Sequence, residues 1–294
     1  MRRRAFLTNL ALIPLTGMSM KLEDLNKLAS SYDSAGTMPV LFVGHGSPMN
    51  AIEDNVFSRK WAEIGKKLPK PKAILSVSAH WETKGVHVTA MKHPKTIHDF
   101  GGFPQELFEV EYPAAGSPEL ASETADLLRP AEVLPDQNWG LDHGSWSVLK
   151  RMYPMADVPV LQLSLDYARS PESHYLLAKE LALLREKGVL ILGSGNLVHN
   201  LRMVAWDRLN EPGVGYDWAL EADGKMKQLI LAGNHKALID FRSQGRAFDL
   251  AIPTPEHFLP LLYILGLKKD HEQIEFFNEQ AVAGSLTMTS LKIG

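Results

Sequence analysis

Histidines follow three stretches of apolar sequence, each close to a glycine or another small residue. They are His45 in Gly44-His45-Gly46, His80 in Ser78-Ala79-His80, and His199 shortly after Gly195. An imidazole can bind a transition metal, and it can transfer a proton near neutral pH. Side chains beyond the carboxyl ends of strands in an α/β sheet line one crevice. We therefore expect these histidines to share a metal or acid/base site, although each alone is compatible with a structural, hydrogen-bonded role.

The segment 139–146 places Asp142 and His143 between glycines and tryptophans. This composition fits a second contribution to the same site, with Asp142 orienting an imidazole through a hydrogen bond. It also fits a tight turn stabilised by aromatic packing.

The segment 254–260 has the signature of a helix start, with Thr254 as N-cap and Pro255 at the first helical position. In that interpretation His257 faces a pocket and Glu256 lies in the favourable field of the helix N-terminus. Helix capping without any catalytic role is the alternative.

The loop 97–104, which contains His98, Asp99 and Phe103, is rich in glycine, aromatic and acidic residues. Loops of this composition often line substrates, although a plain structural turn fits as well. The remaining histidines lie in polar or helical contexts and are expected at the surface: His87, His93, His174, His235 and His271.

Composition restricts the chemistry further. The 294 residues contain no cysteine, which excludes disulfides, thiolate metal sites and cysteine nucleophiles. Any transition metal must therefore be held by imidazole and carboxylate. A net charge of -3 without a concentrated basic segment argues against a nucleic-acid partner. Neither a phosphate-binding loop nor a His-Glu-x-x-His helix is present.

The elements that position these residues alternate along the chain. Apolar runs bounded by glycine predict buried strands at 40–43, 73–78, 158–164 and 189–195. Helices are expected near 59–67, 174–187, 218–233, 235–242 and 255–265. This alternation predicts an α/β fold, in a single domain with a central, mostly buried β-sheet flanked by helices.

The N-terminal residues need separate treatment. Arg3 and Arg4 precede a short apolar run, 10–15, which is too short to span a bilayer, so we expect no stable membrane anchoring. The pattern is similar to a twin-arginine export signal, but it lacks a clean cleavage site. Periplasmic and cytoplasmic locations both stay open. We assign 1–35 to a signal and linker and 36–294 to a catalytic domain.

Six segments together carry a resemblance to a known family, and they occur in the family's order. They are 44–49, 78–81, 98–104, 140–144, 193–200 and 254–257. This set resembles the class III extradiol dioxygenases of the LigB type, in particular the 4,5-DOPA extradiol dioxygenase subgroup. The resemblance covers the chain from about Pro39 to its end.

The resemblance implies specific roles. His45, His80 and His257 match the metal ligands of the subgroup, in which His257 stands where other class III enzymes use a glutamate. His199 matches an acid/base residue that sometimes counts as a fourth ligand, and His143 matches a second catalytic histidine. The expected cofactor is one divalent metal per chain, Fe(II) for catalysis or Zn(II) as the bound species. Substrate-binding candidates are His98, Asp99, Phe103 and Trp81.

The function implied is a metal-dependent extradiol dioxygenase. It would insert both atoms of O2 into a catechol such as DOPA and release a ring-opened muconic semialdehyde. The partners are thus a small aromatic diol and O2, with the oligomeric state undetermined. Two alternatives are a zinc-dependent hydrolase and a non-catalytic binding protein on the same fold, similar to the Memo type.

Overall fold

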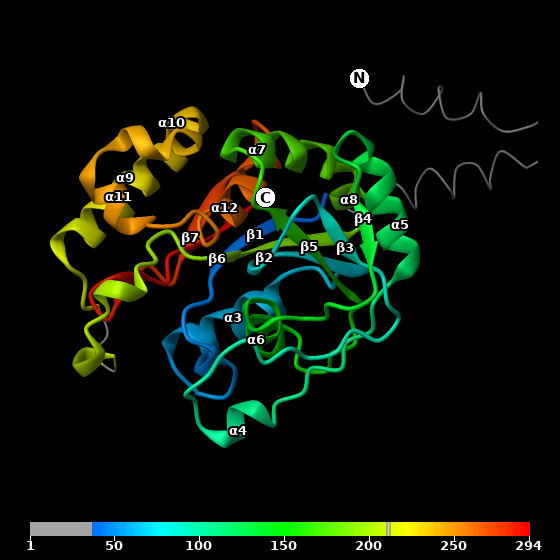
Figure 1. The fold of residues 1–294 in the computed structure, drawn as a ribbon, viewed down its shortest axis with the longest axis horizontal. Helices are drawn as coiled ribbons and strands as arrows, with labels where there is room; N and C mark the ends of the chain where they lie inside the picture. Colours follow the sequence, from blue (N-terminus) through cyan, green and yellow to red (C-terminus); the bar gives the residue numbers. More distant parts are fainter. Residues whose placement is uncertain (1–36, 210, 212) are drawn as a thin grey trace, which may run out of the picture. The chain divides into compact units, whose positions relative to one another are not determined.

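Four parallel strands form the centre of an eight-stranded sheet in the computed structural model, which describes residues 37–294 except 210 and 212 (Figure 1). They are β5 (Val160–Asp166), β2 (Ala73–Thr83), β6 (Val189–Gly195) and β1 (Val40–Gly44), in that spatial order. Their carboxyl ends lie at one edge of the sheet.

Shorter strands extend the sheet on both sides of this centre. β3 (His87–Thr89) pairs antiparallel with β5, and β4 (Leu134–Asp136) lies outside it. On the other side, β10 (Ser290–Ile293) pairs antiparallel with both β1 and β7 (Ile274–Phe277). A separate two-stranded ribbon joins β8 (Ala281–Val282) to β9 (Leu286–Thr287). The sheet is therefore mixed: its buried centre is parallel, as is the outer pair of β3 and β4, and the other pairs are antiparallel.

Helices cover both faces of the sheet (Figure 1). On one face pack α5 (Pro118–Leu127), α7 (Pro171–Glu180), α8 (Ala182–Glu186) and α12 (Leu259–Gly266), joined by α9 (Asp217–Leu231), α10 (His235–Ile239) and α11 (Arg246–Ala251). The other face packs against α3 (Val56–Lys67) and α6 (His143–Met152), and α4 (Gln105–Phe108) lies beyond it.

Side chains alternate between these faces along each central strand. On β2, Leu75 and Val77 belong to the core under α7 and α12. The positions between them, Ser76 and Ser78, face α6 and hydrogen-bond to its first turn or its N-cap. This alternation decides which strand-end residues can meet at α6.

The expected α/β fold with a central buried sheet is confirmed, and β6 has the predicted bounds. Three helix predictions were wrong in detail. The helix expected over 235–242 ends at Ile239, and a short 3-10 helix, Phe241–Gln244, follows it. The helix expected over 174–187 is two helices that meet at Leu181. The helix expected from Pro255 begins only at Leu259.

The physical reason for the later helix start is a tertiary hydrogen bond. The Asn196 backbone N–H donates to the carbonyl of His257 at 2.9 Å, so this carbonyl is held by β6 rather than by a helical turn. Thr254 does not cap a helix, because α12 begins five residues later, and its hydroxyl donates to the Glu256 side chain at 2.8 Å.

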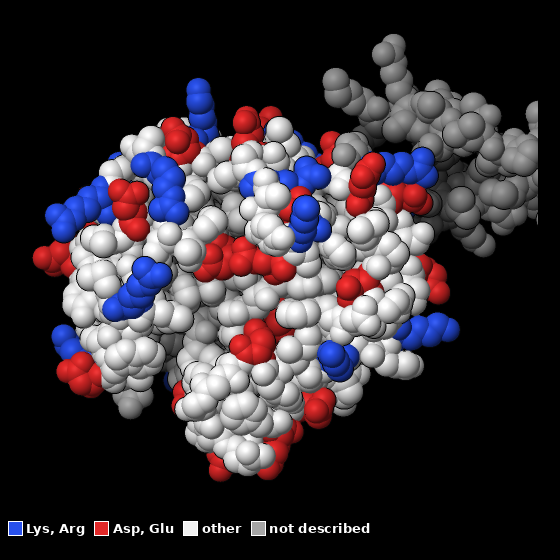
Figure 2. All heavy atoms as spheres, viewed as in Figure 1, with Lys and Arg blue, Asp and Glu red and all other residues white. Residues whose placement is uncertain are grey.

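None of the helices within the described residues is long and apolar enough to cross a bilayer. The expected twin-arginine signal at 1–35 lies outside the described residues. Lysine and arginine side chains are scattered singly over the face shown in Figure 2 and form no continuous basic surface there.

His174, expected at the surface, is fully buried between α7 and α12. Its Nε2–H donates to the backbone carbonyl of Asp166 at 3.2 Å, and its Nδ1 accepts from the Tyr263 hydroxyl at 3.1 Å. Burial is the main cause that lowers the pKa of His174 to about 4.

This burial predicts a pH dependence of stability. As the pH falls from 6.5 towards 4, His174 becomes protonated in the unfolded chain but stays neutral in the folded protein, so the free energy of unfolding decreases. From pH 7 to pH 5 we expect this residue to remove about 2 kcal/mol of unfolding free energy.

Urea titrations of the wild type and His174→Gln at both pH values measure the effect. Glutamine keeps one donor and one acceptor but does not titrate, so its stability should fall by about 2 kcal/mol less than that of the wild type. Equal losses in the two proteins would contradict the prediction.

Candidate active site

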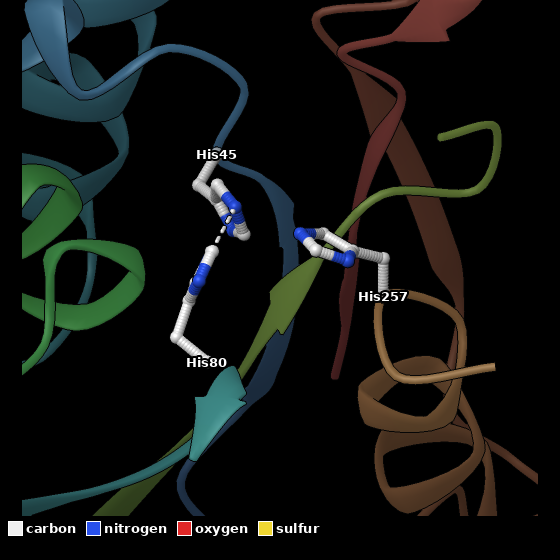
Figure 3. A group of neighbouring side chains, drawn as sticks. All are labelled: His45, His80 and His257. Atoms are coloured by element: carbon white, nitrogen blue, oxygen red, sulfur yellow. Dashed lines mark hydrogen bonds between the residues drawn. The ribbon is translucent and has the colours of Figure 1, made fainter. Parts of the chain in front are cut away.

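Three histidine side chains converge at the carboxyl edge of the central strands (Figure 3). His45 follows β1, His80 belongs to β2, and His257 lies in the turn before α12. The Nε2 atoms of His45 and His80 are 3.0 Å apart, and ligand atoms of all three residues lie within 4.8 Å of one another. The structure thus brings together the three residues that were expected to bind metal.

Strand geometry explains the convergence of the first two. His45 continues the alternation of Leu41 and Val43, which face α6, and His80 continues that of Ser76 and Ser78. β6 lies between β1 and β2, and its last residue, Gly195, lies directly beneath the His257 turn.

Each of these imidazoles has its Nδ1 atom directed at an oxygen. The His45 Nδ1 is 3.0 Å from the Ser194 hydroxyl, which itself donates to the Gly144 carbonyl. The hydroxyl must therefore accept from His45, which places the proton on Nδ1. The His80 Nδ1 lies 3.4 Å from Asp99 Oδ2, and the His257 Nδ1 lies 3.1 Å from Glu256 Oε1. In His45 the Nε2 lone pair is therefore left for another partner, and the carboxylates beside the other two Nδ1 atoms favour the same tautomer.

This donor set fits a divalent metal. The His257 Nε2 is buried and has no hydrogen-bond partner. Burial, reinforced by the neighbouring histidines, lowers the pKa of His45 and of His257 well below the ordinary value, and it lowers the pKa of His80 to about 3. Neutral imidazoles with converging lone pairs and oriented Nδ1–H groups are the arrangement in which proteins bind zinc or iron.

Two further histidines flank this set. His143, the first residue of α6, has its ring centroid 3.9 Å from that of His80. His199 stacks on His257 with a centroid distance of 3.5 Å and an interplanar angle of 9°. Burial lowers the pKa of His199 to about 4, so it is neutral near physiological pH. Both lie close enough to act on a molecule bound beside the three Nε2 atoms.

Asp99 connects two of the rings. Its Oδ2 lies 3.0 Å from the His143 Nδ1 and 3.4 Å from the His80 Nδ1, and its Oδ1 accepts from the His143 backbone N–H at 2.9 Å. Burial raises the pKa of Asp99, but the hydrogen bonds from His143 and the electrostatic interactions with both rings outweigh burial, so the pKa of Asp99 is lowered and the group is a carboxylate.

Asp142 does not orient an imidazole, and that expectation was wrong. Its carboxylate accepts from Ser78 at 2.7 Å, from Gln162 at 2.6 Å and from the Ser145 backbone at 3.1 Å. The physical reason is its position as N-cap of α6, which directs the side chain to the helix N-terminus and the sheet.

Of the other substrate-binding candidates, Phe103 lies near the site through Phe100, whereas Trp81 points away from it. Trp81 points to the opposite face of β2 from His80 and stacks on Trp139 with a centroid distance of 5.6 Å. The His98 Nε2 lies 3.0 Å from the Val110 carbonyl. Phe103 packs edge-on against Phe100, whose ring in turn lies 5.6 Å from that of His143. The structure thus brings the phenylalanine pair to the site, places the His98 ring 5.8 Å from that of Phe100, and engages Trp81 elsewhere.

Sequence reasoning did not identify Ser194 as a partner of His45. The available signal was its place in β6, where alternation puts it on the α6 face together with Leu190 and Leu192.

Gly195 allows the His257 turn to approach β6. A Cβ atom at this position would lie 2.1 Å from the His257 carbonyl oxygen, so an alanine must displace the backbone that carries the ligand. For Gly195→Ala we expect about 1–3 kcal/mol of lost stability and at least about tenfold weaker zinc binding.

Thermal melting and zinc competition with a chromophoric chelator measure these two effects. Gly224→Ala in α9 is the matched control, because nothing lies within 4 Å of its added Cβ and alanine favours helix. Undiminished zinc affinity in Gly195→Ala would show that the approach does not position His257.

Comparison with known proteins agrees with this geometry. Residues 38–290 match the family described as the catalytic LigB subunit of aromatic ring-opening dioxygenase. The chain is 47% identical over 265 residues to an Escherichia coli (strain K12) 4,5-DOPA dioxygenase extradiol, which covers 89% of this chain and 96% of that protein. It is 38% identical over 259 residues to a Beta vulgaris protein of the same name, which covers 85% and 94%.

A solved structure gives the same result for the fold. The crystal structure of an uncharacterized Escherichia coli K12 protein superposes with a TM-score of 0.76 and 42% sequence identity, over 87% of this chain and all of that one. The family expected from the sequence is therefore confirmed. This chain belongs to the LigB family of aromatic ring-opening dioxygenases, and it is an extradiol dioxygenase.

Proposed function

We propose that this enzyme cleaves the ring of a catechol such as DOPA next to its diol, with O2 as co-substrate, and releases a muconic semialdehyde. The observation that carries the proposal is the convergence of the His45, His80 and His257 Nε2 atoms, each with its Nδ1 directed at an oxygen. The similar Escherichia coli and Beta vulgaris proteins bear names that support DOPA as the substrate.

We assign one divalent metal per chain to these three Nε2 atoms. When bound, Fe(II) supplies the electron transfer between catechol and O2 that ring cleavage requires, and Zn(II) is a second ion that three neutral imidazoles fit. Catalytic residues are His199 and His143. His199 is neutral, so it can accept a catechol proton and later return it.

His143 acts from the other side of the site, where its Nε2 is free to hydrogen-bond O2 or the substrate because Asp99 holds its Nδ1. Among the substrate-binding candidates, Phe103 supports the apolar wall that Phe100 presents next to His143. His98 backs this wall with its ring 5.8 Å from that of Phe100, whereas Trp81 stacks on Trp139 on the other face of β2. The catalytic domain we assign is 36–294, with a small aromatic diol and O2 as its partners.

Anaerobic loading with Fe(II), followed by O2 uptake and visible absorbance, tests this function. L-DOPA, caffeic acid and protocatechuate serve as substrates. We expect stoichiometric O2 consumption and a yellow ring-opened product with at least one of them. Absence of O2 uptake at full iron occupancy would reject the proposal. Ester hydrolysis by the zinc form would then favour the hydrolase, and inactivity of both forms would favour a Memo-like binding protein.

A further inference from the structure

Both carboxylate oxygens of Asp99 are engaged by groups of the protein. Its Oδ1 accepts the His143 backbone N–H at 2.9 Å, and its Oδ2 lies against the Nδ1 atoms of His143 and His80 at 3.0 and 3.4 Å. The side chain is 17% exposed. A residue that recognises substrate needs at least one oxygen directed at it, whereas here both oxygens face N–H groups of the protein.

The loop that carries Asp99 is fixed against the segment before α6. The Ile97 N–H donates to the Leu141 carbonyl at 2.7 Å, the Leu141 N–H donates to the Lys95 carbonyl at 2.8 Å, and the Trp146 indole N–H donates to the Ile97 carbonyl at 2.8 Å. These bonds flank His143 at Leu141 and Trp146, and on the Asp99 loop they hold the residues just before Asp99. Such a pairing positions a side chain more precisely than a free loop does.

We propose that Asp99 is a positioning residue that holds His80 and His143 in the same tautomer, with Nδ1 protonated and Nε2 free, and does not bind the substrate. This inference rests on the proposed function, because it assigns His80 to the metal and His143 to catalysis. One carboxylate then serves both: it gives His80 a free Nε2 for the metal, and it gives His143 a free Nε2 for the reactants. His45 and His257 obtain the same tautomer from separate partners, Ser194 and Glu256.

Asp99→Asn tests the proposal because it replaces one acceptor oxygen by an NH2 donor and leaves the side chain the same size. The amide oxygen must stay on the His143 backbone N–H, which can only donate, so the amide NH2 takes the place of Oδ2. This NH2 group cannot accept from either Nδ1 atom. Both rings are then driven to carry the proton on Nε2, where it blocks metal binding by His80 and proton acceptance by His143.

We expect zinc affinity, measured by competition with a chromophoric chelator, to fall about 10–100-fold in Asp99→Asn. Ring-cleavage turnover of the iron-saturated protein should fall about 10²–10⁴-fold. In a His143→Ala background, the same substitution should still weaken zinc binding through His80 but should change turnover much less. That separation identifies the two rings through which Asp99 acts.

Histidine ¹⁵N NMR of the zinc-loaded wild type reads the tautomers directly, and it does not depend on the variant folding. We expect Nδ1–H for both His80 and His143, and a shift to Nε2–H for His143 in Asp99→Asn. Asp136→Asn is the matched control, because Asp136 accepts backbone N–H groups of Asn138 and Trp139 and contacts no imidazole.

Nε2–H on His143 in the wild type would overturn the proposal, as would unchanged zinc affinity in a folded Asp99→Asn. A loss confined to the KM for one catechol, with affinity and tautomers unchanged, would instead make Asp99 a substrate-binding residue. The zinc and NMR results stand even if no catechol is cleaved, so a failure of this inference is distinct from a failure of the proposed function.

Discussion

His257→Ala should weaken metal binding by at least about 100-fold and abolish ring cleavage. The imidazole is one of three converging donors, its Nε2 has no other partner, and alanine offers no ligand atom in its place. Zinc competition with a chelator and O2 uptake after iron loading measure the two effects.

His257→Glu provides a sharper comparison than the alanine variant alone. A carboxylate restores a ligand and creates the common set of two histidines and one carboxylate, so metal binding should recover relative to His257→Ala. His93→Ala is the control, because His93 is exposed and lies outside the three metal-competent groups. A His257→Ala protein that binds zinc as tightly as the wild type would exclude His257 as a ligand.

His199→Ala is expected to reduce turnover about 10²–10⁴-fold while zinc affinity changes less than about tenfold. His199 stacks on the face of His257, whereas the three converging Nε2 atoms belong to His45, His80 and His257. Removing it should therefore eliminate a proton acceptor and leave the principal ligands in place. Steady-state O2 uptake and chelator competition on the same preparations separate the two quantities.

The resemblance also allowed His199 as a fourth ligand, and the same experiment decides between the two roles. His199, Glu256 and His257 offer ligand atoms within 4.8 Å of one another, so a shared metal is geometrically accessible to His199. A fall in zinc affinity as large as that of His257→Ala would assign His199 to the metal. His235→Ala, at a histidine that begins α10 and pairs with Tyr175, controls for the loss of a partly buried imidazole.

The strand-end histidines were predictable because the information is local. Glycine-bounded apolar runs identify buried strands, and residues at the ends of parallel strands share one edge of a sheet. That reasoning predicted a common site for His45, His80 and His199 before any tertiary contact was known. Recognition of His257 needed the family resemblance, because local sequence alone fits a helix cap equally well.

Carboxylate partners were not predictable in the same way. Asp142 is adjacent to His143 in sequence, yet N-capping of α6 directs it to Ser78 and Gln162. The carboxylate that reaches His143 is Asp99, which comes from a distant loop. Two residues that are adjacent in the chain at a helix N-terminus need not have side chains in contact, because the N-cap side chain turns to accept backbone N–H groups of the first turn.

Sequence alone thus determined the fold class, the four central strands and the candidate histidines, since periodicity, glycine boundaries and motif order are properties of short segments. Tertiary structure decided the start of α12, the burial of His174, and which oxygen faces each Nδ1. These features depend on hydrogen bonds between segments far apart in the chain. Their energies appear only when folding excludes water and each buried polar group must find a partner.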